Sequence, residues 1–289
     1  MNKCRTSLAA FALAWLAAGS WELSAVMALA QTAVPPLPRI PELMREVVDH
    51  QKQLEKVREN YTYSATETIQ EIGSDGQVKK TETEEEEVFF VNGHPIGRTV
   101  KKNGQALTGH DLDKETAHVT KLVEKAEKTP SGQPLEGDVV SVSRLLEIMD
   151  VRNERRENYR GRPAIVFDFV GRKSARTHGL AEDASKKLEG TLWIDEADRQ
   201  IAHLDAVFDD NFHIGGGVVA NLQKGSNFHF DQAQVNGEVW LPTGAQGTVQ
   251  ARVLLMKSFH QRFSERDYDF KRFSVAAEQG KGAKVTGAK

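Results

Sequence analysis

The nine histidines are the residues best able to bind a metal ion, and their spacing argues against a metal site. No two of them are separated by a single residue, and none belongs to the H-E-x-x-H pattern that holds zinc on a helix. His203, His213 and His229 could meet on neighbouring strands, but the ligand spacing typical of zinc sites is missing. We therefore expect no metal site and no cofactor.

Patterns for nucleophilic and phosphate chemistry are also missing. The sequence has no G-x-S-x-G motif and no G-x-x-x-x-G-K-S/T motif. The glycine triplet at residues 215–217 has no predicted helix after it to bind phosphate, so we expect a bend or bulge there. Cys4, the only cysteine, lies in a segment that we expect to be removed. We expect the protein not to be an enzyme, and a secreted hydrolase of unknown type stays open as an alternative.

Charge is concentrated in two clusters of opposite sign, while the formal net charge is only −3. This balance gives no basic field for nucleic acid, so we expect no nucleic-acid partner. The acidic cluster could bind cations or a basic partner, but a solvated edge strand protected by its charge is favoured. The basic cluster could pair with these glutamates across strands or face an anionic head group. The clusters are Glu82, Glu84, Glu85, Glu86 and Glu87, and Arg152, Arg155, Arg156, Arg160 and Arg162.

The amino terminus is typical of an export signal. Lys3 and Arg5 precede a short apolar run, and Ala28-Leu29-Ala30 provides a small-x-small cleavage site. We expect residues 1–30 to be a cleaved signal peptide, which places the mature protein in the periplasm. Residues 31–41 form a proline-rich spacer, residues 42–275 one domain, and residues 276–289 a disordered tail.

Hydrophobic periodicity predicts a helix, a strand meander, two more helices and then almost only strands. The helices are expected at residues 42–59, 113–128 and 138–149, the last with Asp138 as N-cap. Ten or eleven antiparallel strands are expected in all. The long late strands cover residues 218–232, 238–253 and 254–273, and turn signals stand at Asp75-Gly76, Asn92-Gly93, Asn103-Gly104, Arg160-Gly161 and Asn236-Gly237.

Three helices are too few to cover a sheet of this size. Strands lie ~4.8 Å apart and a helix is ~10 Å wide, so one helix covers about two strands. We therefore expect a curved sheet with an uncovered apolar trough, whose lining suits acyl chains. The predicted ligand-binding residues are Phe89, Val91, Leu145, Leu146, Met149, Ile165, Phe167, Phe169, Leu192 and Ile194, and Leu204, Phe208, Phe228 and Phe230 also point inward.

Local motifs resemble those of the bacterial outer-membrane lipoprotein-sorting superfamily, which includes LolA, LolB and RseB. They are the segment from Gly190 to Asp195 followed by Arg199 and Ile201, the hairpin from Tyr159 to Pro163, and the segment from Val239 to Pro242. The resemblance implies an α+β fold, an unclosed β half-barrel whose concave apolar face is lidded by helices. It also implies carriage or sensing of lipid-modified proteins, without catalytic residues.

The predicted function is therefore that of an exported carrier or sensor that binds a lipid, or the acyl chains of a lipoprotein, in an apolar cleft. An interaction protein of an envelope-stress pathway, using the same cleft and binding an envelope membrane protein, is the alternative. Transient contact with a membrane is compatible with either prediction.

Overall fold

The computed structural model describes residues 36–130, 135, 140–217, 219–253 and 257–272, and all of its helices and strands belong to the unit Leu37–Lys289. The predicted signal peptide, residues 31–35 of the proline-rich spacer and the predicted tail lie outside these residues. Within the described part, no helix has the length and apolar character needed to span a membrane.

Helix α1 (Ile40–Arg58) begins two residues before the predicted start. Pro41 lies in its first turn, where a proline ring fits the helix and its missing N–H is not needed. One side of the helix buries Leu43, Val47 and Leu54, which recur at helical spacing. This stripe is the reason that α1 packs against the sheet.

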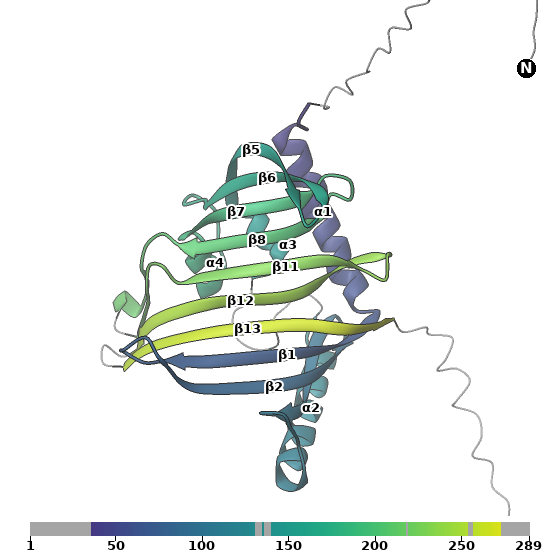
Figure 1. Ribbon diagram of the computed structural model, residues 1–289, viewed down its shortest axis with the longest axis vertical. Coiled ribbons are helices and arrows are strands. Elements are labelled where there is room, and N and C mark those ends of the chain that lie inside the picture. The colour runs from purple at the N-terminus through teal and green to yellow at the C-terminus, as the bar shows by residue number, and fades with distance from the viewer. Residues whose placement is uncertain (1–35, 131–134, 136–139, 218, 254–256, 273–289) are drawn as a thin grey trace, which may run out of the picture. The chain divides into compact units, whose positions relative to one another are not determined.

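A single antiparallel sheet of thirteen strands forms the body of the unit, and it does not close into a barrel (Figure 1). The predicted α+β class and the unclosed half-barrel are therefore confirmed. The strand order is β4-β3-β2-β1-β13-β12-β11-β8-β7-β6-β5, with β10 paired to β12 and β9. The bounds are β1 Tyr61–Ile72, β2 Val78–Val91, β3 His94–Lys102, β4 Gln105–Ala106, β5 Met149–Tyr159, β6 Arg162–Gly171, β7 Leu188–Asp195, β8 Ile201–Phe208, β9 Phe212–Ile214, β10 Ala220–Leu222, β11 Asn227–Val235, β12 Val239–Val253 and β13 Lys257–Arg272.

The predicted hairpin turns are present because asparagine and glycine tolerate the left-handed conformation. Asn92 and Asn103 have φ angles of 48° and 49°, and the glycines after them are also positive. Asn236 repeats the pattern with a φ of 53°. These turns fix which strands become neighbours, and through them the register of the sheet.

The element count differs from the prediction for both strands and helices. Three short strands, β4, β9 and β10, raise the strand total to thirteen. The strand predicted over residues 218–232 is instead divided into β10 and β11, with Gly225 at a φ of 87° between them. The fourth helix, α4 (Leu180–Ser185), escaped prediction because it has six residues and buries only Ser185.

The helix predicted over residues 138–149 is α3 (Val142–Glu147), which has only six residues. Its N-cap is Ser141, whose hydroxyl accepts from the backbone N–H of Arg144 at 3.2 Å. The predicted cap Asp138 lies outside the described residues. The glycine triplet Gly215–Gly217 forms a short 3-10 turn with positive φ angles.

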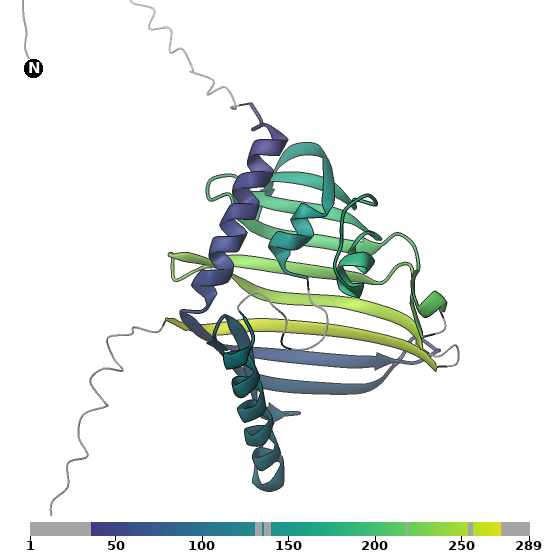
Figure 2. The ribbon, with the colours of Figure 1, turned by 180° about the vertical axis from the view of Figure 1, so that it is seen from behind.

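Helices α1 and α3 lie on one face of the sheet, here called the inner face, and the other face is called the outer face (Figure 2). The main core fills the space between these helices and strands β6, β7 and β8. Burying one large apolar side chain contributes about 1.5–3 kcal/mol, so this layer is the main source of stability. Helix α2 (Gly109–Lys128) packs elsewhere, against β2 and β3.

The two ends of the sheet are strands β4 and β5. Strand β4 has only two residues. Strand β5 contains a bulge between Arg152 and Arg155, where Asn153 has a φ of 56°. Strand β2, which carries the glutamate cluster, is flanked by β1 and β3, so the prediction of an edge strand there is wrong.

Candidate functional site

Eight of the ten predicted ligand-binding residues lie together in the filled core. All eight are at most 7% exposed, and they pack between the inner face and helices α1 and α3. An acyl chain could reach them only if a helix moved. Phe89 and Val91 lie on β2, which five strands separate from β7, and they project from the outer face, so the prediction that they point inward is wrong. The eight are Leu145, Leu146, Met149, Ile165, Phe167, Phe169, Leu192 and Ile194.

A row of apolar residues continues from this core into a more open part of the inner face. Phe228, Gly247, Phe263 and Ile69 are register partners across β11, β12, β13 and β1, and Phe228 pairs on its other side with the core residue Ala206. Paired residues project from the same face. The three large side chains of the row are partly exposed. In Figure 2, no described helix lies over the middle of strands β12, β13 and β1.

Gly247 allows this row to be continuous. A Cβ added there would lie 2.8 Å from the ring atom Cε1 of Phe263, and 2.3 Å from the backbone oxygen of Asn227. Such contacts are too close for any side chain. Because glycine leaves this space free, the Phe263 ring lies across β12 toward Phe228.

The neighbouring row changes from apolar to acidic along the same face. Phe230, Ala245, Glu265, Glu67 and Glu84 are register partners across β11, β12, β13, β1 and β2. Burial raises the pKa of Glu67, and the charges of Glu265 and Glu84 raise it further. The inner face therefore has an apolar side under the helices and an acidic side at β13, β1 and β2.

Asp267 lies at the buried end of this acidic region. It is 8% exposed, and its Oδ1 atom has no hydrogen-bond partner among the described residues. Burial, followed by the charge of Glu265, raises the pKa of Asp267 to about 8. It borders a narrow pocket with Arg58, Tyr63 and Phe270 that has no room for a water-sized sphere. Burial therefore favours the protonated form of Asp267.

The glutamates of β2 alternate between the two faces of the sheet. On the outer face, Glu85 accepts from Lys101 at 2.8 Å and Glu87 forms an ion pair with Arg98. Both basic partners lie on the neighbouring strand β3, whereas Glu84 belongs to the inner acidic row. The alternation follows from the two-residue period of a strand.

The arginine cluster of β5 and β6 does not pair with the glutamates of β2, because these strands lie at opposite ends of the sheet. Instead Arg156 donates to Glu196 at 2.6 Å, and Arg155 donates to Asp168 at 3.1 Å. The predicted cross-strand pairing with the glutamates is wrong. Both pairs are partly exposed, and surface ion pairs typically contribute only about 0–1 kcal/mol each to stability.

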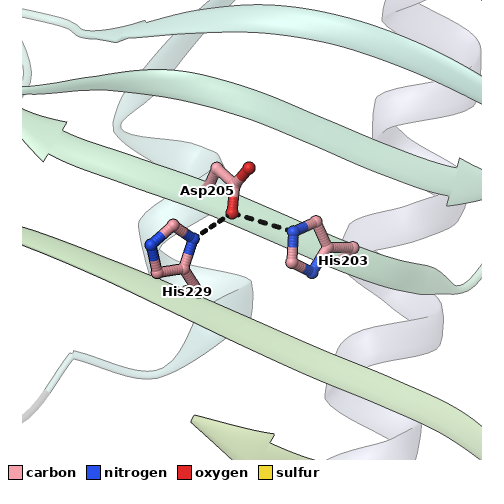
Figure 3. Close-up of side chains that lie close together, drawn as sticks. All are labelled: His203, Asp205 and His229. Carbon is pink, nitrogen blue, oxygen red and sulfur yellow. Dashed lines mark hydrogen bonds and ion pairs between the residues drawn. The ribbon is translucent and has the colours of Figure 1, made fainter. Parts of the chain in front are cut away.

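A second cluster of polar side chains lies on the outer face of β8 and β11 (Figure 3). His203 pairs in register with Asp231, and Asp205 pairs with His229. Because Leu204 lies between His203 and Asp205 and is buried on the inner face, these two side chains project outward. Two histidines and two aspartates thus alternate on four adjacent positions.

The two histidines converge on one carboxylate. His203 Nε2 lies 2.8 Å from Asp205 Oδ1, and His229 Nδ1 contacts the same oxygen. The other nitrogen of His203, Nδ1, lies 2.9 Å from Asp231. Burial lowers the pKa of His203, but the hydrogen bond to Asp231 and the charges of both aspartates together raise it above its ordinary value.

Aromatic and basic neighbours hold this cluster in place. The ring of His203 stacks on Tyr159 with centroids 5.2 Å apart and contacts Trp193 at 5.0 Å. The Tyr159 hydroxyl donates to Asp231 at 3.0 Å, and Arg160 pairs with the same aspartate at 3.0 Å. Burial and this hydrogen bond raise the pKa of Tyr159 to about 12. The Asp231 carboxylate therefore has three separate partners.

The histidine prediction from the sequence is confirmed in part. His203 and His229 do meet on neighbouring strands, but His213 lies on β9 and is not in the cluster. Asp205, the third member of the cluster, belongs to no H-x-H pattern. Two H-x-D patterns, at residues 203–205 and 229–231, could have revealed it, because a strand places such pairs on one face.

No family model and no curated protein matches the chain. Among solved structures it is similar to a putative outer membrane lipoprotein-sorting protein domain from Vibrio parahaemolyticus, with 12% identity over 80% of this chain and 94% of that chain and a TM-score of 0.34. A DUF1329 family protein from Desulfovibrio piger matches with 12% identity over 80% and 93% and a TM-score of 0.33. The MucA/MucB complex of Pseudomonas aeruginosa matches with 11% identity over 80% and 100% and a TM-score of 0.22. A lipoprotein-sorting protein domain is thus among the solved structures that this chain is similar to, in agreement with the resemblance of its sequence motifs.

Proposed function

We propose that the protein is an exported periplasmic carrier or sensor that binds an acyl chain of a lipid or lipoprotein on the inner face of the sheet. The main support for this proposal is the partly exposed apolar row of Phe228, Phe263 and Ile69, which continues a fully buried core. The sheet is unclosed, and the described strands supply no second sheet over this row of the kind that a sandwich or barrel would have.

The dimensions of the row suit one chain. The four strands from β11 to β1 span roughly 14 Å at the usual strand spacing of ~4.8 Å. Each buried methylene contributes about 0.8 kcal/mol, so a chain lying along the row gains enough for a stable complex. The eight core residues predicted from the sequence would extend this surface if α3 moved away from the sheet.

The acidic row favours one kind of acyl group over another. Glu67 and Glu265 lie beside the apolar row, and their carboxylates would repel an anionic head group, whereas Glu84 beyond them forms an ion pair with Lys102 at 2.9 Å. A chain joined through an ester or amide, as in a lipoprotein, has no free carboxylate. We therefore assign the row to such esterified or amidated chains in preference to a free fatty acid.

The Phe263→Asp variant is expected to weaken binding of a fluorescent acyl-chain probe with an uncharged head group at least tenfold. The change removes an apolar ring from the middle of the row and adds a charge that the chain would desolvate. The measurement is the Kd by fluorescence titration of the full chain. Val78→Asp, at a residue 46% exposed on β2, serves as the control and should leave the Kd unchanged.

Equal affinity in wild type and Phe263→Asp would exclude the row as the binding surface. Far-ultraviolet circular dichroism of both variants establishes that the sheet is intact. Phe228→Asp tests the same row from strand β11, and its Kd for the probe should rise as much as that of Phe263→Asp.

A further inference from the structure

We propose that His203, Asp205 and His229 bind a zinc ion on the outer face of the sheet, at a site separate from the acyl-chain row. The three donor atoms come from two neighbouring strands and lie within 4.8 Å of one another. Two imidazoles converge on one carboxylate oxygen, which is the arrangement that a shared metal ion would hold.

The distances leave room for the ion after a small adjustment. Tetrahedral zinc with ligands at 2.0–2.1 Å places its donor atoms about 3.3 Å apart. The present separation of 2.8 Å between His203 Nε2 and Asp205 Oδ1 would widen by about half an ångström. The rotamers of His229 and Asp205 can supply this change, because both side chains are more than a third exposed.

The surroundings of His203 resemble the outer sphere of known zinc sites. A zinc-bound histidine usually donates its other N–H to a carboxylate, which orients the ring and fixes the tautomer. In this protein that carboxylate is Asp231, 2.9 Å from Nδ1, and it is itself held by Tyr159 and Arg160. Nε2 of His203 is then the atom that faces the metal.

The donor set selects the class of ion. Two imidazoles and one carboxylate suit zinc and neighbouring transition metals, whereas calcium and magnesium prefer all-oxygen ligands. The side chain of His203 is 14% exposed, while Asp205 and His229 are 39% and 37% exposed. The open side leaves a fourth position for water or for a group of a bound partner.

The test is isothermal titration of the full chain, prepared without a polyhistidine tag and treated with a chelator, with zinc chloride. One zinc ion per chain is expected to bind, and magnesium chloride should give no signal. His229→Ala and Asp205→Asn are each expected to raise the zinc Kd at least 100-fold. His213→Ala should leave the Kd unchanged, because His213 lies on β9 outside the cluster.

Absence of stoichiometric zinc binding by the wild type would overturn the assignment. Zinc binding that is equally tight in His229→Ala and Asp205→Asn would also overturn it, since the ion would then lie elsewhere. A melting curve gives an independent reading. Zinc should raise the Tm of the wild type and of His213→Ala, and it should leave the Tm of Asp205→Asn unchanged.

Discussion

Replacing Phe167 with alanine should lower the free energy of unfolding by about 3–5 kcal/mol. Phe167 is fully buried in the core beneath α1 and α3, and its register partner Leu192 is fully buried as well. Removal of the ring would leave a cavity that this close-packed layer cannot fill. Guanidinium unfolding followed by tryptophan fluorescence measures the loss.

The same variant distinguishes a filled core from an open cleft. If Phe167 lined a water-filled trough, its truncation would cost less than about 1 kcal/mol, because the ring would already be exposed. A loss that small would contradict the packing described for the inner face. Val78→Ala, at an exposed position of β2, should change the stability very little and serves as the control.

Replacing Asp267 with asparagine should stabilise the fold at pH 8 by roughly 2–5 kcal/mol. Burial raises the pKa of Asp267 from 3.8 to about 8 in the folded protein. Between these two values the unfolded chain has lost the proton and the folded chain retains it. The unfolded state therefore binds fewer protons, and this carboxyl group reduces the stability as the pH rises from about 4 to about 8.

The asparagine side chain has nearly the same shape and does not ionise. The variant should therefore lack this part of the pH dependence, and its advantage over the wild type should be small at pH 4 and largest at pH 8 and above. Urea unfolding at a series of pH values measures the difference. Asp269→Asn, an exposed position on the same strand that pairs with Lys271, is the matched control. An advantage that does not grow with pH would contradict the raised pKa of Asp267.

The sequence predicted those features of the fold that depend on neighbouring residues. The turns at Asn92 and Asn236 and the buried stripe of α1 follow from backbone preference and local periodicity. Features that depend on distant packing were not predicted. The pairing of β1 with β13 joins strands from opposite ends of the domain, and no local signal indicates it, whereas the turns at Asp75-Gly76 and Asn92-Gly93 already give β2 its neighbours β1 and β3.

The candidate sites depend even more on register than the fold does. Glu67, Glu84 and Glu265 are side by side, yet β1 and β13 are separated by almost the whole domain in sequence. Strand pairing of that range cannot be derived from periodicity alone. The inward-facing residues were identified correctly as a group for β6 and β7, but periodicity does not show that helices already cover them.

The two ends of the open sheet determine whether it can be lengthened by another chain. An unpaired strand presents N–H and C=O groups that a foreign backbone could bind. At one end β4 has only two residues, and beside it helix α2 packs against β3, where Glu115 accepts from the backbone N–H of Thr99 at 2.8 Å. At the other end the bulge of β5 between Arg152 and Arg155 interrupts the ladder, next to charged side chains. Both ends of this unclosed sheet are therefore poor templates for the strand-by-strand addition that leads to polymerisation.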